Sequence, residues 1–463
     1  MPDISPLPRK SSVIVVGGGL SGLVAARDLI RAGVQDVVIV EAQDEIGGRI
    51  KSFTRPNGGT LEQGAEFTGT SQPTMLALLA ELGIETQPMT AGVDPAAPGL
   101  FVRISNGQRH LEPYPLADDP EALSDLTAGL AAFGEMVGDI STDAPWEDPR
   151  ALELDRRTVG MWVDETVSNP AANRALKDLL QFFGPTYETS LLLALAYLER
   201  FGGIEHLGEG IESKLVGGTS GLVAKLAAEI GDRIYLSAPV RKIVNGSDAV
   251  SVETDRGTID GDLVIVAMDP SLITAIEFEP TLPNDRAKLQ IRWGGNAGAK
   301  VCAIYDTPFW REDGLAGFAI GEKFLQMAID VSPAERSEGV LTGMVFAYEE
   351  HSGKTARILE DPELTRKTAL AELESYYGPK AANPIELYVF DWTGKRWSHS
   401  AGGTTLSPGV LTTCGPALRR PVGRVLWAGE AVGSGIFMEG AASAGKAAAA
   451  AAVARLNGEV TPA

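Results

Sequence analysis

The sequence has few of the residues that form disulfide frameworks and metal sites. Its 463 residues include two cysteines, Cys302 and Cys414, and four histidines that are scattered without the spacing of metal ligands. Two cysteines so far apart in the chain provide neither a disulfide framework nor a thiolate metal site. We therefore expect a protein that binds no metal.

Signals for membranes, export and nucleic acids are also missing. The first ten residues lack the apolar core of a signal peptide, and no run approaches the roughly 18 apolar residues of a membrane span. The formal net charge of −21, without a basic cluster, argues against nucleic acid and anionic membranes as partners. We expect a cytoplasmic protein. Its acidity reflects a soluble surface or, alternatively, attracts cationic small molecules.

One stretch near the N-terminus reads as a strand, a glycine-rich turn, a helix and a second strand. The run Val13–Val16 leads into GGGLSG, a helical pattern follows from Leu20 to Arg31, and Val37–Val40 ends on Glu41. These glycines permit a tight turn, close approach of a pyrophosphate and close helix packing. Glu41 follows about 20 residues later, where a carboxylate accepts ribose hydroxyls. The pattern predicts a dinucleotide site; the alternative is a glycine turn without a ligand.

The next segment favours FAD over NAD. Gly47 and Gly48 are followed by Arg49, which suits a longer pyrophosphate contact because a guanidinium is a forked donor. A second glycine-rich stretch, residues 217–221, allows a phosphate loop or a helix cap. We favour the cap, because the preceding strand is weak and no acidic residue follows at the right distance.

Length and pattern predict two interleaved domains. A chain of 463 residues is too long for one ordinary core, and 44% hydrophobic residues indicate a globular protein. We expect an α/β (α+β two-domain) fold with a Rossmann-like FAD-binding domain at 1–88, 212–284 and 396–463. The substrate-binding domain, of mixed sheet plus helices, takes 89–211 and 285–395. Local patterns predict a hairpin turn at 57–59, helices at 73–82 and 362–377, irregular chain at 89–120, and largely helical chain at 120–200.

Nearly end to end, the chain resembles the flavin-containing amine oxidases. The resemblance rests on GGGLSGL with Glu41, the GGR ending at Arg49, GGTSGL to PVRKI, Lys300 before YDTPFW, Trp392, and AGE followed by FMEGAASAG. It implies the amine-oxidase fold and FAD-dependent oxidation of an amine to an imine. Oxygen would accept the electrons, giving hydrogen peroxide.

The resemblance also implies which residues contact FAD. The glycine turn would hold the pyrophosphate, Glu41 the ribose, and the backbone of Val240 the adenine, while Met438 would begin a helix aimed at the flavin. The full set of expected cofactor residues is Gly17, Gly19, Leu20, Ser21, Gly22, Glu41, Ala42, Gly48, Arg49, Gly64, Ala65, Glu66, Val240, Trp392, Gly429, Glu430, Phe437 and Met438.

Two residues are catalytic candidates. The resemblance assigns Lys300 to the lysine that reaches flavin N5 through a water; the alternative is a strand lysine whose ammonium extends to the surface. Glu66 stands where relatives often have an aromatic residue. It is either a solvated loop glutamate or a carboxylate beside the substrate nitrogen, acting as cation anchor or general base. Burial beside flavin would raise the pKa of Glu66.

Departures from the family bear on the cofactor and substrate. Ala401 stands where many relatives bond a cysteine to the flavin, so we expect non-covalent FAD. Gly402 and Phe437 match the two aromatic faces around the amine, so half of that cage is missing. Together with Glu66, these residues predict a substrate bulkier than a simple amine. We also expect Tyr187 to line the substrate cavity, with core packing as the alternative for aromatics of residues 152–201.

Other readings of the function stay open. The partner is a small-molecule amine or amide, with oxygen as co-substrate, and a homodimer is an option. One alternative is an oxidase that tailors a bulky natural product, resembling the lankacidin-type amide oxidase, in which the imine is trapped intramolecularly. Another is a desaturase, an isomerase or a non-oxidase flavoprotein.

Overall fold

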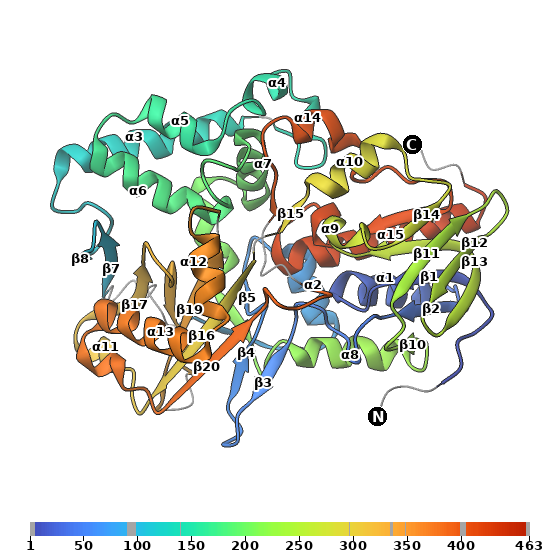
Figure 1. The fold of residues 1–463 in the computed structure, drawn as a ribbon, viewed down its shortest axis with the longest axis horizontal. Helices are drawn as coiled ribbons and strands as arrows, with labels where there is room; N and C mark the ends of the chain where they lie inside the picture. The colour runs from blue at the N-terminus through green and yellow to red at the C-terminus, as the bar shows by residue number, and fades with distance from the viewer. Residues whose placement is uncertain are drawn as a thin grey trace.

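The computed structural model contains two large β-sheets with helices packed around them (Figure 1). It describes residues 5–89, 99–138, 140–295, 297–333, 337–347, 349–398 and 404–459. Among these residues, no helix combines the length and the apolar character needed to cross a membrane.

The first large sheet has eight strands around β1. Its order is β10-β2-β1-β13-β12-β11-β14, and β22 pairs with the end of β13. β1 runs parallel to β2 and β13, as the apolar, β-branched sequence of a strand buried on both faces indicates. The strands are β1 (Lys10–Val16), β2 (Val37–Val40), β10 (Ile234–Tyr235), β11 (Val240–Asn245), β12 (Val250–Thr254), β13 (Gly257–Ala267), β14 (Glu277–Glu279) and β22 (Val425–Ala428).

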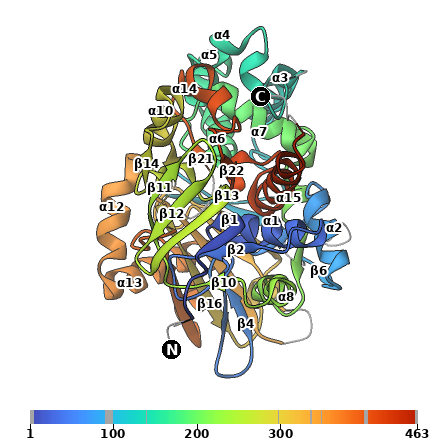
Figure 2. The same ribbon diagram turned by 90° about the vertical axis from the view of Figure 1, so that its right-hand side faces the viewer.

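Four helices pack on one face of this sheet: α1 (Leu20–Arg31), α2 (Pro73–Glu81), α8 (Ser220–Ile230) and α15 (Phe437–Leu456). Figure 2 shows α15 lying beside α1. Gly22 lets α1 approach the glycine turn closely, and Gly445 lets α15 approach α1 closely. A Cβ on Gly22 would lie 2.0 Å from the carbonyl oxygen of Gly17, and one on Gly445 would lie 2.4 Å from that of Ser21.

The other face of the sheet continues into a core formed with a helical region. This region, predicted as largely helical, lies at the top left of Figure 1. Its helices are α3 (Pro120–Val137), α4 (Ala151–Leu154), α5 (Val159–Thr166), α6 (Pro170–Leu180) and α7 (Leu191–Phe201). Nearby are α9 (Pro270–Ile273), α10 (Asn284–Arg292) and α14 (Val410–Cys414).

The second large sheet has seven strands in the order β20-β16-β19-β18-β17-β7-β8. They are β7 (Leu100–Ser105), β8 (Gln108–Glu112), β16 (Ala297–Tyr305), β17 (Leu315–Ile320), β18 (Met327–Asp330), β19 (Gly339–Ala347) and β20 (Glu386–Asp391). Helices α11 (Phe309–Glu312), α12 (Glu349–Leu359) and α13 (Pro362–Tyr377) accompany it. Both large sheets draw their strands from within the segments predicted for their respective domains; the boundaries themselves stay a prediction.

Short strands complete the fold. The hairpin of β3 (Ser52–Thr54) and β4 (Thr60–Glu62) confirms the predicted turn at 57–59. A three-stranded sheet joins β5 (Phe67–Thr68), β9 (Ser213–Leu215) and β6 (Thr86–Pro88), and β15 (Gly294–Gly295) pairs with β21 (Thr404–Thr405).

The prediction of irregular chain at 89–120 is wrong for its described part, because β7 and β8 form a hairpin there. The two turn residues, Asn106 and Gly107, have φ angles of +54° and +74°. An Asn-Gly pair is the sequence signal for such a turn, since both residues tolerate positive φ. Helix α12 was not predicted, whereas α13 has the predicted bounds.

Candidate active site

The glycine turn between β1 and α1 has a geometry suited to binding an anion. Gly17 has φ +107°, and a Cβ there would lie 2.6 Å from the carbonyl oxygen of Ala267. Gly19 is the N-cap of α1, no atom lies within 4 Å of its would-be Cβ, and no described side chain caps the helix. The free N–H groups and positive end of α1 therefore face open space, which fits the pyrophosphate of a dinucleotide.

The GGR segment lies against this turn. The backbone N–H of Gly47 donates to the carbonyl oxygen of Gly18 at 2.9 Å, and Gly47 forms a β-bridge with Gly19. Arg49 reaches across to Glu430, with 3.3 Å between Nη2 and Oε2. The two segments predicted to share the pyrophosphate are thus neighbours.

Glu41 is buried at the end of β2. Its carboxylate accepts hydrogen bonds from the backbone N–H of Gly18 at 2.6 Å and of Gln43 at 2.8 Å. Burial raises the pKa of Glu41, and these hydrogen bonds oppose the shift. The N–H of Ala238 donates to the carbonyl oxygen of Glu41, which brings the segment before Val240 to the same place. The predicted ribose and adenine residues are therefore adjacent.

Other residues expected to contact the cofactor come from other elements. The N–H of Gly429 donates to the Ser21 hydroxyl oxygen at 2.9 Å. A Cβ on Gly64 would lie 2.0 Å from the carbonyl oxygen of Arg49 and 3.0 Å from the indole ring of Trp392. The chain thus passes close beside Trp392 at Gly64. Residues from both large sheets meet here.

Lys300 and Glu66 form a buried ion pair. Lys300 Nζ donates to Glu66 Oε2 at 2.7 Å, and the side chains are 8% and 4% exposed. Lys300 lies in β16 between Met344 of β19 and Phe390 of β20. The alternatives of a solvated Glu66 and a surface-reaching Lys300 are therefore wrong.

Glu62, which the sequence did not single out, is a second carboxylate close enough to feel the charge of Glu66. Glu62 accepts hydrogen bonds from the N–H of Thr219 at 2.9 Å and from the hydroxyl of Ser52 at 2.9 Å. Burial raises the pKa of Glu62, the Thr219 hydrogen bonds lower it, and the charge of Glu66 raises it further. The bond to Thr219, at the start of α8, supports the helix-cap interpretation of residues 217–221.

An aromatic cluster stands at the start of α15. Phe437 has φ +58°, is 36% exposed, and its ring lies 5.9 Å from that of Phe182 and 6.1 Å from that of Phe201. Phe182 and Phe201 come from the helical region, so this region contacts Phe437, one of the expected cofactor residues. Phe183 and Tyr197 are buried in the core.

Tyr187 does not join this cluster. It is 50% exposed, its ring packs where a Cβ of Gly160 would stand, and its hydroxyl donates to Asp164 at 2.8 Å and accepts from Lys177 at 2.6 Å. The structure therefore places it at the surface against α5, and we do not assign it to the substrate site. Gly402 and Ala401 lie outside the described residues. Within those residues, no cluster of three or more His, Cys, Asp or Glu side chains could hold a metal.

Glu439 has a role that the sequence did not predict. Its carboxylate accepts from the N–H groups of Thr74 at 3.2 Å and Met75 at 2.8 Å, so a residue in the first turn of α15 caps α2. Met438 beside it is buried. Among the described residues, no side chain caps the N-terminus of α15. The positive end of this helix dipole can therefore stabilise negative charge nearby.

Comparison with known proteins agrees with this geometry. Residues 20–453 match the family described as flavin-containing amine oxidoreductases. An L-amino acid dehydrogenase of Synechocystis is 31% identical over 452 residues, covering 94% of this chain and 93% of that protein. A putrescine oxidase of Kocuria rosea is 30% identical over 437 residues, covering 90% and 89%.

A solved structure shows the same fold. Cyclohexylamine oxidase from Brevibacterium oxydans superposes with a TM-score of 0.88 at 30% identity, covering 97% of this chain and all of that one. The resemblance noted in the sequence and the predicted fold class are confirmed. The chain therefore belongs to the flavin-containing amine oxidoreductases, and is an FAD-dependent enzyme that acts on amines.

Proposed function

We propose that this enzyme oxidises the C–N bond of an amine to an imine and passes the electrons to oxygen, releasing hydrogen peroxide. The observation that carries the proposal is the buried Lys300–Glu66 pair, which lies among the expected cofactor residues. FAD, when bound, supplies the acceptor for the hydride equivalent that leaves the carbon next to nitrogen. The glycine turn would hold its pyrophosphate, Glu41 its ribose, and Arg49 its phosphates.

Glu66 is the proposed general base. An ammonium must lose a proton before its nitrogen can release electrons into a C=N bond. Glu66 takes this proton, and the C–H electron pair then leaves with hydrogen as hydride while the double bond forms. Its carboxylate is buried and accepts a hydrogen bond from Lys300 Nζ at 2.7 Å, so its position is fixed by a neighbouring cation.

Lys300 is the proposed positioning and electrostatic residue. Its ammonium is held by Glu66 and stands 5.7 Å from the ring centroid of Phe67. In a buried site a fixed positive charge stabilises negative charge that develops nearby, because little solvent screens it. Lys300 would also hold a water by hydrogen bonding, and in this way would assist both hydride loss and the reaction with oxygen.

We propose that FAD is held without a covalent bond. Position 401 is alanine, and the two cysteines of the chain, Cys302 and Cys414, are each 1% exposed. Burial raises the pKa of the Cys302 thiol to about 11, which leaves it without thiolate character at neutral pH.

The substrate is proposed to be bulkier than a simple monoamine. Phe437 offers one aromatic face, and position 402, which the family resemblance pairs with it, is glycine. The curated relatives are named for different substrates and one is named a dehydrogenase, so neither substrate nor acceptor follows from similarity. A bulky amide or amine of a natural product is the second candidate, favoured by this half cage.

Anaerobic stopped-flow reduction of the holoenzyme tests the proposal. The panel comprises monoamines, diamines, amino acids and bulky N-acyl compounds. Loss of flavin absorbance with an amine, followed by stoichiometric peroxide on admitting air, supports the oxidase. Reduction by bulky amides alone supports the second candidate. Reduction without peroxide contradicts oxygen as the acceptor, and no reduction by any compound contradicts C–N oxidation.

A further inference from the structure

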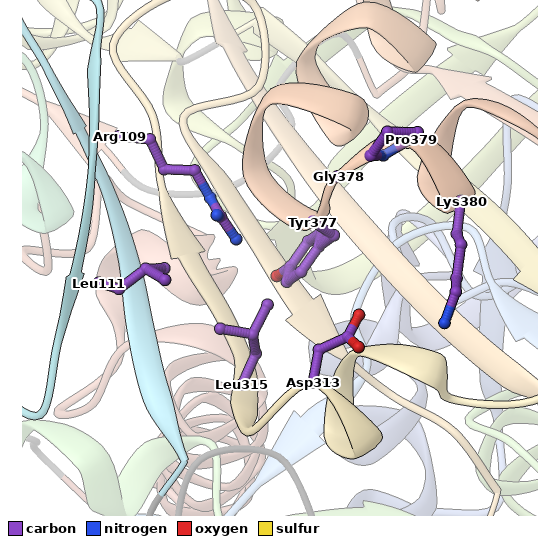
Figure 3. A pocket seen from close by; sticks show the side chains of 8 residues that line it. All are labelled: Arg109, Leu111, Asp313, Leu315, Tyr377, Gly378, Pro379 and Lys380. Carbon is purple, nitrogen blue, oxygen red and sulfur yellow. The ribbon is translucent and has the colours of Figure 1, made fainter.

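A cavity of about 300 Å³ lies at the edge of the seven-stranded sheet, away from the cofactor residues (Figure 3). Three parts of the chain form it: β8, the segment from α11 into β17, and the end of α13 with the 3₁₀ helix that follows (Pro379–Ala382). The side chains that define it are Arg109, Leu111, Asp313, Leu315, Tyr377 and Lys380.

The sheet separates this cavity from the Lys300–Glu66 pair. Successive side chains of a strand point to opposite faces. In β16, Ala299, Val301 and Ala303 pack in the same core as Tyr377 of α13, so Lys300, between Ala299 and Val301, points to the other face. A ligand of the cavity would therefore not belong to the amine site.

Tyr377 has a buried hydroxyl without a partner at the floor of the cavity. The residue is 3% exposed, and within the described part of the chain its hydroxyl has no hydrogen-bond partner. The two other buried tyrosines of this core are satisfied: Tyr305 donates to the carbonyl oxygen of Ala381 at 2.8 Å, and Tyr376 donates to that of Leu325. Buried polar groups are nearly always paired, so the exception points to a missing acceptor.

The rim supplies cations around this hydroxyl. Arg109 Nε donates to the carbonyl oxygen of Tyr376 at 2.9 Å, which fixes the guanidinium beside the cavity. Figure 3 shows the guanidinium of Arg109 and the hydroxyl of Tyr377 turned toward the same space, with Asp313 and Lys380 on the other side. Lys380 Nζ stands 5.4 Å from the ring centroid of Phe309. Two cations face one carboxylate here, on a protein whose net charge is −21.

We propose that this cavity binds a small monocarboxylate that also carries a hydrogen-bond donor, namely an amino or hydroxy acid. The carboxylate accepts from the Tyr377 hydroxyl and from the fork of Arg109, which matches its geometry. Burial raises the pKa of Tyr377 well above its ordinary value, so the hydroxyl stays a donor at neutral pH. Asp313 accepts from the ligand's O–H or N–H group and disfavours a second negative charge.

Calorimetric titration of the holoenzyme with L-lactate, propionate and inorganic phosphate tests the proposal. None of these is an amine, so turnover does not confuse the measurement. We expect lactate to bind saturably, and propionate and phosphate to bind at least fivefold more weakly. Tyr377→Phe and Arg109→Gln should each weaken lactate binding at least fivefold. Arg366→Gln, an equal change of charge on an exposed residue of α13 outside the cavity, should not.

Melting temperatures show whether a variant has lost lactate binding because it is misfolded. Because Tyr377→Phe deletes an unpaired buried hydroxyl, its melting temperature without lactate should equal or exceed that of the wild type. At one fixed concentration, lactate should raise the melting temperature of the wild type more than that of this variant. Absence of saturable binding, equal lactate affinity in Tyr377→Phe, or tighter binding of phosphate than of lactate would overturn the proposal.

Discussion

At the scale of single residues, the reaction is proposed to depend on Glu66. Glu66→Gln keeps the shape of the side chain and removes the base, so anaerobic flavin reduction should slow by about 10²-fold or more. Stopped-flow absorbance measures this rate. Glu372→Gln is the matched control, because Glu372 is a partly buried carboxylate that accepts from the N–H groups of Phe324 and Leu325, on the opposite face of the sheet. An unchanged rate in Glu66→Gln would remove this residue from the mechanism.

A second prediction at the residue scale concerns how Glu62 makes the stability of the fold depend on pH. Since burial raises its pKa in the folded state, folding favours the protonated form, and its contribution to stability is complete at low pH. That contribution is lost as pH rises from the ordinary carboxyl pKa through the folded value. Glu62→Gln cannot ionise, so its free energy of unfolding should rise relative to that of the wild type between pH 4 and pH 8. Urea unfolding at both pH values checks this, and a constant difference would contradict it.

At the scale of elements, Glu439 links α15 to α2. Glu439→Ala leaves the N–H groups of Thr74 and Met75 without their acceptor, and should lower the free energy of unfolding by about 1–2 kcal/mol. Glu439→Gln keeps an acceptor oxygen and should recover at least half of this loss. Urea denaturation measures both. If the two variants lose the same amount, the cap is not the cause.

At the scale of the whole molecule, the cofactor site joins segments distant in sequence, so FAD should stabilise the fold. Acid precipitation should release the yellow cofactor into the supernatant, since we expect no covalent bond. Adding FAD back should raise the melting temperature progressively, because FAD at 100 times its dissociation constant adds about 2.7 kcal/mol to the free energy of unfolding. Yellow colour that stays in the pellet would contradict non-covalent binding.

Local sequence was enough for the elements whose signal is local. The strands around the glycine turn, the helix α13 and the hairpin at 57–59 follow from apolar periodicity and turn residues, which act over a few positions. The β7–β8 hairpin had an Asn-Gly signal of the same kind that was overlooked amid prolines. Helix α12 is missed for another reason: its sequence is mostly polar, and it packs against β19 and α13.

The sequence by itself determined the FAD-binding unit and the order of the family motifs, because these depend on backbone geometry that glycine and short-range spacing control. Only the tertiary structure decided the state of the candidate site. Glu66 and Lys300 are 234 positions apart, and neither could be known to be buried or paired until β16 and the β4–β5 segment were brought together. Tyr187 turned to the surface, and Glu62 and Glu439 gained partners, for the same reason: a side chain's charge and contacts are set by neighbours that only the folded chain supplies.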